Sequence, residues 1–361
     1  MKRLLTAAQF SVPAATLLAF ATTAYAESGV NLTNGDRLSA AAQAAAIAHL
    51  KANHATIIRI PLEQWNGSAV ASVNLAANAV AAGLQVHMIV TLATAPVYGG
   101  AAIRPYNSAY PGVWAAYPLS QISQAQFAQW LASALGQLEN AGVLPAALEI
   151  GNEINNPAFN GDFSVPGHDV VYGLADLVTG STPEAEAVAA GFQQYARALL
   201  TAQEVISASG YSIPVISAGL ANPGKAGANV TDGLSWVAIN DTLSYLRMYG
   251  LDSFVSAYGI HVYPWESTPV ARLNDIKNNA LTQCGMTGIP CAITEWGFQL
   301  PAQWTCPAPD AARLALAQEI LGDFGQFDVA EKLWFDWSSS SYGLWQCNAL
   351  TGTGALVLGQ P

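Results

Sequence analysis

The chain has 361 residues, a formal net charge of −11 at pH 7 and only 10% charged residues. So few lysines and arginines provide no basic stripe for phosphate groups, which argues against nucleic acid as a partner. A charge-poor, acidic surface suits a neutral substrate. The length is great for one β-sandwich but ordinary for one barrel with loop insertions, so we expect a single domain. We also expect a monomer, although no sequence feature determines the oligomeric state.

Residues 1–26 have the pattern of an export signal. Two basic residues near the start precede an apolar stretch broken by Pro13, and Ala24 to Ala26 form a small-x-small cleavage site. The uninterrupted apolar run is shorter than the roughly 20 residues that a membrane-spanning helix needs. We therefore expect a cleaved signal peptide, a mature domain over 27–361 without a membrane anchor, and a secreted or periplasmic protein.

Strand-like and helical segments alternate about eight times, which is typical of parallel α/β proteins. The predicted strands are 29–32, 56–61, 84–92, 146–152, 213–218, 255–262, 291–295 and 332–337. The predicted helices are 36–53, 69–82, 122–141, 183–209, one ending near 248, 271–283 and 310–324. The Gly-rich tail contains no convincing eighth helix. This order predicts a single (β/α)8 TIM barrel in which the last helix is incomplete and replaced by irregular chain.

The active site of such a barrel lies where the strands end, because the loops that follow them converge there. Two carboxylic acids, Glu153 and Glu295, sit where an apolar strand gives way to a loop. This is a costly place for a partly buried charge unless chemistry uses it. Paired carboxylates predict a glycosidase. Arg59, within strand two, is a further candidate. The other candidates at the strand ends are Asn152, His261, Tyr263 and Trp337.

Four strings in this order resemble the glycoside hydrolases of clan A over essentially the whole mature chain. They are LEIGNEINN on strand four, YGIHVYP on strand six, AITEWGF on strand seven and LWFDWSS on strand eight. Two departures are Gly151, where many clan members have Trp, and the absence of a His at the end of strand three. The resemblance therefore indicates the clan and leaves open the cellulase-like family five and the xylosidase-like family thirty-nine.

The resemblance implies a role for each matching residue. Glu153 would be the acid/base, Glu295 the nucleophile, and Asn152 the residue that holds the sugar 2-hydroxyl. His261 and Tyr263 would flank the nucleophile, and Trp337 would form the floor of the central sugar subsite.

Aromatic rings bind sugars by stacking, and three follow directly on strands two, six and seven. We expect Trp65, Trp265 and Trp296 to line sugar subsites. Glu149 lies on strand four and is expected to point into the barrel and pair with Arg59, in a role that is either structural or supports the nucleophile. His87 lies inside strand three, where a core histidine is expected.

All four cysteines lie in the last quarter of the chain, and an even number in an exported protein favours disulfides over metal ligands. Cys284 and Cys291 bracket the turn into strand seven. Cys306 and Cys347 lie in the loops after strands seven and eight, at the opposite end of a barrel. We predict these two pairs, with the second stiffening the loops beside Glu295. No C-x-x-C pair or spaced His cluster occurs, so we expect no metal and no cofactor.

The sequence thus predicts an exported retaining β-glycoside hydrolase that cleaves a poly- or oligosaccharide by double displacement through a glycosyl-enzyme intermediate. Two alternatives remain open. One is a carbohydrate-binding barrel with little catalytic activity, and the other is a transglycosylase that uses the same two carboxylates.

Overall fold

The computed structural model describes residues 27–62, 69–92, 96–221, 233–264, 266–279, 281–301, 304–338 and 341–359. The predicted signal peptide, Trp65 and Trp265 lie outside these ranges. Within them, every helix is too short or too polar to cross a lipid bilayer.

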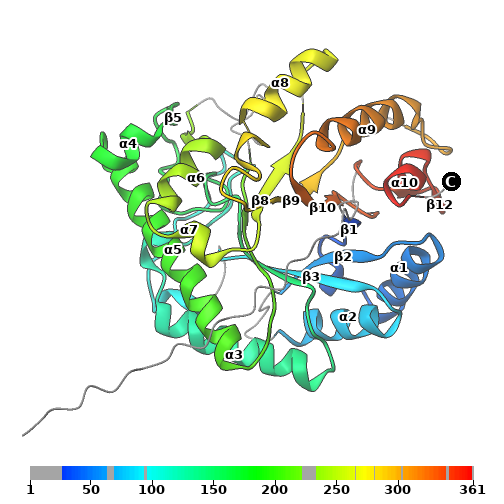
Figure 1. Cartoon of the computed structure of the whole chain (residues 1–361), viewed down its shortest axis with the longest axis horizontal. Coiled ribbons are helices and arrows are strands. Elements are labelled where there is room, and N and C mark those ends of the chain that lie inside the picture. Colours follow the sequence, from blue (N-terminus) through cyan, green and yellow to red (C-terminus); the bar gives the residue numbers. More distant parts are fainter. Residues whose placement is uncertain are drawn as a thin grey trace, which may run out of the picture.

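Eight parallel strands form the centre of the molecule and the helices surround them (Figure 1). Along the sheet the order is β6-β4-β3-β2-β1-β10-β9-β8. Bridges between β6 and β8 close it, since Leu220 N donates to Gly259 O at 3.0 Å and His261 N donates to Leu220 O at 2.9 Å. The barrel strands are β1 (Glu27–Asn31), β2 (Ile57–Pro61), β3 (Gln85–Val90), β4 (Ala147–Asn152), β6 (Val215–Gly219), β8 (Tyr258–Val262), β9 (Cys291–Trp296) and β10 (Val329–Trp334). The predicted TIM barrel is confirmed.

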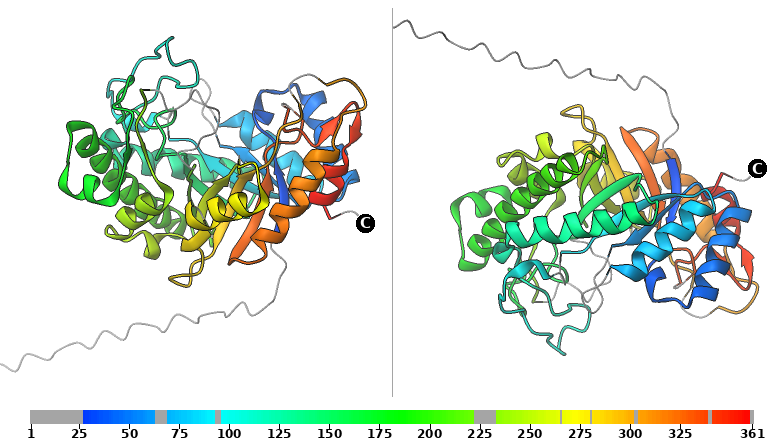
Figure 2. Two further views of the ribbon diagram at one scale, coloured as in Figure 1. Left: turned by 90° about the horizontal axis from the view of Figure 1, so that it is seen from above. Right: turned by 90° about the horizontal axis from the view of Figure 1, so that it is seen from below.

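Helices cover the outside of the barrel, and the barrel strands are therefore buried on both faces, as their apolar runs require (Figures 1 and 2). The longest helix begins where Pro183 follows Thr182, whose Oγ1 accepts a hydrogen bond from Ala185 N at 3.0 Å. The helices are α1 (Ala40–Ala52), α2 (Val70–Ala81), α3 (Gln124–Asn140), α4 (Leu174–Thr179), α5 (Pro183–Ala208), α6 (Ile239–Arg247), α7 (Leu251–Phe254), α8 (Pro269–Asn279), α9 (Ala311–Phe324) and α10 (Gly352–Val357).

Short elements occupy the loops. Four 3-10 turns are η1 (Gly35–Arg37), η2 (Pro96–Tyr98), η3 (Leu119–Gln121) and η4 (Leu281–Gln283). Two small two-stranded sheets pair β5 (Val171–Tyr172) with β7 (Trp236–Val237) and β11 (Trp345–Gln346) with β12 (Ala349–Leu350). The first of these sheets ties the long loop after β4 to the chain that precedes α6.

Several predicted elements have different boundaries, and two of them differ for a clear physical reason. The first helix was predicted from residue 36, but it begins at Ala40 because the Ser39 hydroxyl accepts a hydrogen bond from Ala42 N and caps it. The eighth barrel strand was predicted at 332–337 and lies at Val329–Trp334. Its interior contains Glu331, a polar residue that is typical of a loop, and this carboxylate is buried 2.8 Å from His87 Nδ1.

The tail forms a short eighth helix, α10, where irregular chain was predicted. It packs on α9 (Figure 1), and Asp310 holds it by accepting hydrogen bonds from the backbone N of Thr353 at 2.6 Å and from its hydroxyl at 2.9 Å. Thr351 caps its first turn. The helical position is therefore filled, although by six residues only.

Both predicted disulfides form. Cys284 and Cys291, with Cα atoms 5.1 Å apart, lie just before and at the start of β9. Cys306 and Cys347, with Cα atoms 5.7 Å apart, join the loop after β9 to the loop after β10. The pairing predicted from the two ends of the barrel is confirmed.

The two bridges are expected to stabilise the fold unequally. They close loops of different length, since their cysteines are 41 and 7 residues apart. Loop-closure entropy then assigns about 4 kcal/mol to Cys306–Cys347 and about 2.5 kcal/mol to Cys284–Cys291. Urea denaturation of the two double Cys→Ala variants should show the larger loss for the longer loop, and equal losses would contradict this assignment.

Candidate active site

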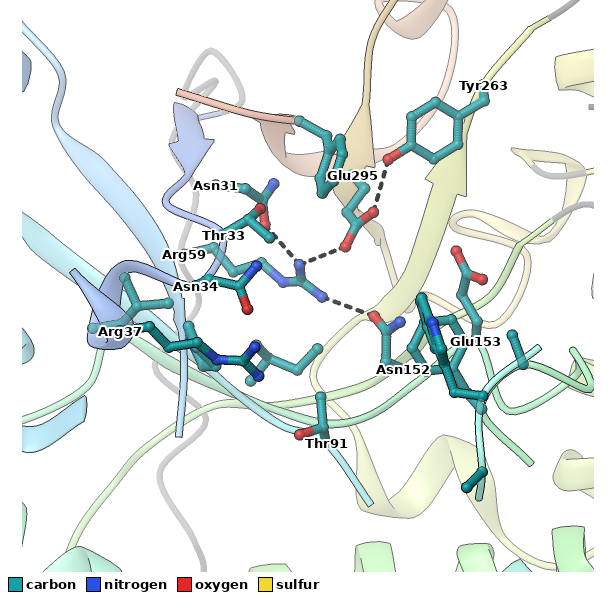
Figure 3. A pocket seen from close by; sticks show the side chains of 18 residues that line it. Asn31, Thr33, Asn34, Arg37, Arg59, Thr91, Asn152, Glu153, Tyr263 and Glu295 are labelled. Atoms are coloured by element: carbon teal, nitrogen blue, oxygen red, sulfur yellow. Dashed lines mark hydrogen bonds and ion pairs between the residues drawn. The ribbon is translucent and has the colours of Figure 1, made fainter. Parts of the chain in front are cut away.

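A cavity of about 730 Å³ opens at the carboxyl ends of the barrel strands. Its polar lining comes from the ends of several strands, and Figure 3 shows these side chains converging on one space. The polar lining residues are Asn31, Thr33, Asn34, Arg37, Arg59, Thr91, Asn152, Glu153, Tyr263 and Glu295. The cavity thus brings together the two predicted carboxylates with Arg59, Asn152 and Tyr263.

The Arg59 guanidinium is the centre of this arrangement. It is 4% exposed and donates from Nε and Nη2 to the two oxygens of Glu149 at 2.6 and 3.1 Å. Nη1 donates to Asn31 Oδ1 at 2.6 Å and to Glu295 Oε1 at 2.8 Å, and Nη2 also reaches Asn152 Oδ1 at 3.3 Å. Burial opposes the positive charge, but Glu149 and Glu295 outweigh it and raise the pKa of Arg59. A single fixed fork therefore orients residues from β1, β4 and β9.

Glu149 continues a chain of alternating charges into the barrel. Its Oε2 lies 3.1 Å from His87 Nε2, and the other ring nitrogen of His87 lies 2.8 Å from Glu331. Burial would lower the pKa of His87, but the Glu331 and Glu149 carboxylates outweigh it and raise that pKa to about 9. Burial would likewise raise the pKa of Glu149, but Arg59 and His87 hold it at about 2. His87 is a core residue, as predicted, and it belongs to the support of Arg59.

Glu295 receives two hydrogen bonds inside the cavity. Arg59 Nη1 donates to one carboxylate oxygen at 2.8 Å, and Tyr263 Oη donates to the other at 2.7 Å (Figure 3). Burial raises the pKa of Tyr263 well above its ordinary value, and the negative charge of Glu295 adds to this effect. Tyr263 thus remains a neutral hydroxyl donor. Both donors stabilise a negative charge on a carboxylate that is only 8% exposed.

Glu153 stands on a sharp turn at the end of β4. Gly151 has φ +89° and Glu153 has φ +42°, so two residues of the turn adopt left-handed backbone. A Cβ on Gly151 would contact Ala218, Ile154 and Tyr195 at 3.2 Å each, in a conformation that L side chains rarely adopt. This constraint explains why glycine stands where many clan members have Trp.

Glu153 has two side-chain partners. Its Oε1 lies 2.9 Å from His261 Nδ1, and its Oε2 accepts from Asn156 Nδ2 at 2.6 Å. Burial alone would lower the pKa of His261. The negative charges of Glu295 and Glu153 outweigh this effect and raise that pKa above its ordinary value. Gly219 makes room for this ring, because a Cβ there would lie 2.1 Å from His261 Nε2.

His261 lies between the two carboxylates. Its Nδ1 is 3.6 Å from Glu295 Oε2, and the carboxylate oxygens of Glu153 and Glu295 lie within 4.8 Å of one another. These three groups are close enough to hold a metal ion, but their atoms already engage one another and the other donors of the site. The two carboxyl groups are thus held close together beside the cavity.

The predicted aromatic contacts differ from the structure. Trp296 is fully buried against Trp334 and Phe324, and Trp337 is 1% exposed and stacked on Trp345. Neither is among the described residues that line the cavity. Phe335, the first residue after β10, lines the cavity instead. The shift of the eighth strand by three residues causes this difference. Trp65 and Trp265 lie outside the described residues.

Other cavity residues were not singled out from the sequence. Asn31 lines the cavity and ends the first barrel strand. Like Asn152, it is a polar residue at the end of an apolar run, and this pattern could have identified it from the sequence. Asn156 lies three residues after Glu153, a spacing that one tight turn can bring together. Trp114, Ala158 and Phe159 come from long loops. In such loops the spacing of residues in the sequence does not predict which side chains face the cavity.

The chain matches no protein-family model and no curated protein sequence. Its structure is similar to those of glycoside hydrolases. A fungal β-1,4-galactanase superposes with a TM-score of 0.56 at 14% identity, covering 93% of this chain and 94% of that one. A GH5-4 broad-specificity endoglucanase from an uncultured bacterium gives 0.53 at 14% identity, with 87% of both chains covered. A GH113 β-1,4-mannanase gives 0.51 at 10% identity, with 92% and 100% covered. The resemblance to clan A is confirmed at the level of the fold.

The ion pairs of His87 predict a specific dependence of stability on pH. Because its folded-state pKa of about 9 exceeds the ordinary 6.5, the protonated ring stabilises the fold fully below pH 6.5. This contribution, on the order of 3 kcal/mol, is lost as the pH rises through 9. Melting curves from pH 6 to 9.5 should show a steeper decline for the wild type than for His87→Asn, which lacks the titrating ring.

His54→Asn is the matched control, since His54 is exposed and is not a member of this chain of charges. It should keep the wild-type slope. Parallel curves for the wild type and His87→Asn would show that His87 is not protonated in the folded protein.

Proposed function

We propose that the protein is an exported retaining β-glycoside hydrolase that cleaves a poly- or oligosaccharide by double displacement. The observation that carries this proposal is the pair Glu153 and Glu295, with carboxylate oxygens within 4.8 Å at an open cavity. Retaining glycosidases place their carboxyl groups about 5 to 5.5 Å apart, whereas inverting enzymes need roughly 6.5 to 9.5 Å to admit a water molecule. The spacing therefore favours retention.

In the first step Glu295 attacks the anomeric carbon of the bound sugar. The bond to the glycosidic oxygen breaks, its electron pair stays on that oxygen, and Glu153 protonates it so that the sugar alcohol leaves. His261 Nδ1 lies 2.9 Å from Glu153 Oε1 and orients this carboxyl group for the transfer. The product is a glycosyl ester of Glu295.

In the second step Glu153 acts as a base. It takes a proton from water, the water oxygen attacks the anomeric carbon, and the ester bond to Glu295 breaks. The carboxylate that leaves regains the hydrogen bonds from Arg59 and Tyr263. These donors are already in place, so the charge that returns to Glu295 requires little reorganisation.

The glycone subsite is proposed at Asn152, Tyr263 and Phe335. Arg59 fixes the Asn152 carbonyl oxygen, which leaves the amide Nδ2 to donate to the sugar 2-hydroxyl. Phe335 takes the aromatic role that the sequence assigned to Trp337, because it is the aromatic residue directly after β10 and it lines the cavity. Trp65 and Trp265 remain predictions for further subsites.

The substrate class follows from the site and from the similar structures. The similar structures described above are those of a β-1,4-galactanase, a broad-specificity endoglucanase and a β-1,4-mannanase. We therefore propose a β-linked neutral polysaccharide or its oligomers. Export is supported by the signal-like residues 1–26 and by the two disulfides, which persist in oxidising compartments.

Removal of either carboxylate should reduce hydrolysis in a diagnostic way. On a panel of β-linked polysaccharides and aryl β-glycosides, Glu295→Ala should lose at least about 10³-fold in kcat, since a covalent nucleophile is removed. With added azide and an activated aryl glycoside, Glu153→Ala should form the β-glycosyl azide and Glu295→Ala the α-glycosyl azide. Glu186→Ala, an exposed carboxylate on α5, is the control and should keep full activity.

Two results would overturn the proposal. If the wild type binds a polysaccharide and cleaves nothing, the protein is a carbohydrate-binding barrel. If the variants at Glu153 and Glu295 retain activity, other residues perform the chemistry. Transfer of the sugar to a second sugar, with little release to water, would instead identify a transglycosylase using the proposed carboxylates.

A further inference from the structure

An aromatic pair lines the cavity outside the proposed catalytic residues. Trp114, from the segment between β3 and α3, contacts Phe159, from the segment after β4, with ring centroids 5.0 Å apart and planes at 75°. Trp114 is 53% exposed, although tryptophan is on average well buried. Two aromatic rings in contact at the cavity provide a flat apolar surface on which a sugar ring can stack.

The backbone that carries this pair is held in place. Arg104 Nη1 donates to the carbonyl oxygens of Asn160 and Phe163 at 2.9 and 3.0 Å. Its Nη2 donates to those of Trp114 and Pro157 at 3.0 and 2.5 Å. One guanidinium therefore ties together the two segments that present the rings.

The residues on either side of Trp114 are anchored too. Val113 is 4% exposed in a small apolar cluster with Leu234 and Trp236, and Ala116 is fully buried and bridged to Arg104. Between these anchors the Trp114 ring is exposed and Ala115 is half-buried, and both line the cavity. The position of Trp114 is thus fixed before a ligand arrives, which lowers the entropic cost of binding.

A short chain of hydrogen bonds connects the pair to Glu153. Asn156 donates from Nδ2 to Glu153 Oε2 at 2.6 Å and accepts from Ala158 N at 2.7 Å, one residue before Phe159. In the proposed reaction Glu153 protonates the oxygen of the leaving group. The leaving sugar consequently lies on the Glu153 side of the cavity, beside the aromatic pair.

We propose that Trp114 and Phe159 form the subsite for the first sugar ring on the leaving-group side. The inference rests on the proposed function and deepens it, because it assigns a pyranose ring, stacked on Trp114, as the preferred leaving group. Substrates whose leaving group has no ring gain nothing from this surface. Phe159 supports the Trp114 ring by its edge-to-face contact and sets its orientation.

The test compares two substrates of the same glycone sugar, an oligosaccharide and the glycosyl fluoride. Fluoride needs neither a ring subsite nor full protonation, so it reports on glycone chemistry alone. Trp114→Ala should lower kcat/KM about tenfold or more on the oligosaccharide, and by less than about twofold on the fluoride. Trp114→Phe should restore most of the loss, because it keeps a ring at this position.

Tyr106→Ala is the matched control. Tyr106 lies in the segment that carries Trp114 and is 52% exposed, and among the described residues it does not line the cavity. It should leave both substrates unaffected. If Trp114→Ala lowers kcat/KM equally on both substrates, or on neither, the inference is overturned. Cleavage by the wild type would still support the proposed function.

A binding measurement separates the two proposals further. Calorimetry with Glu295→Ala and the oligosaccharide should give an affinity that Trp114→Ala, added to this variant, weakens about tenfold or more. Unchanged affinity in the double variant would overturn the subsite. If the wild type cleaves no panel member and Glu295→Ala binds none, both the proposed function and the subsite are wrong.

Discussion

The Arg59 guanidinium is the interaction on which the rest of the site depends. A buried positive charge is costly unless its donors are satisfied, and here Glu149, Asn31 and Glu295 satisfy them at 2.6 to 3.1 Å. Because a guanidinium does not lose its proton in a protein and its donors form a rigid fork, these oxygens cannot move independently. The position of Glu295 is thereby tied to strands on the other side of the barrel.

The charge of Arg59 also explains the polar residues inside the barrel. Glu149 balances the charge of Arg59, and His87 bridges Glu149 to Glu331. Positive and negative groups therefore alternate from Arg59 to Glu331 on β10. Removal of one member would leave a neighbour buried without its partner, which typically costs about 3 to 5 kcal/mol. The interior of this barrel therefore supports the site as well as filling space.

Much of the fold and of the site could be predicted from the sequence. Parallel strands buried on both faces appear as apolar runs, and polar residues that end such runs, such as Asn152, Glu153 and Glu295, are visible without a structure. The disulfides were predictable because a barrel separates the loops before strands from those after them. In each case a local pattern and the fold class were sufficient.

The errors have physical causes that a local pattern does not contain. The eighth strand carries Glu331, whose partner His87 is remote in sequence, so no local apolar run marks where this strand begins. The strand therefore ends three residues earlier than predicted, and Phe335 lines the cavity in place of Trp337. Trp296 follows the nucleophile but points to the outer core, since strand residues alternate in direction. Trp114 and Phe159 meet only through loop contacts organised by Arg104.

The most direct test of the account is to trap the intermediate. A 2-deoxy-2-fluoro glycoside of the sugar that the protein cleaves, with a good leaving group, should glycosylate the enzyme and stop turnover, because the fluorinated intermediate hydrolyses slowly. Digestion and mass spectrometry should then locate the sugar on the peptide that contains Glu295, and the mass should be absent in Glu295→Ala. A sugar attached to another residue, or an inverted first product with no covalent adduct, would contradict the assignment of Glu295 as the nucleophile held by Arg59.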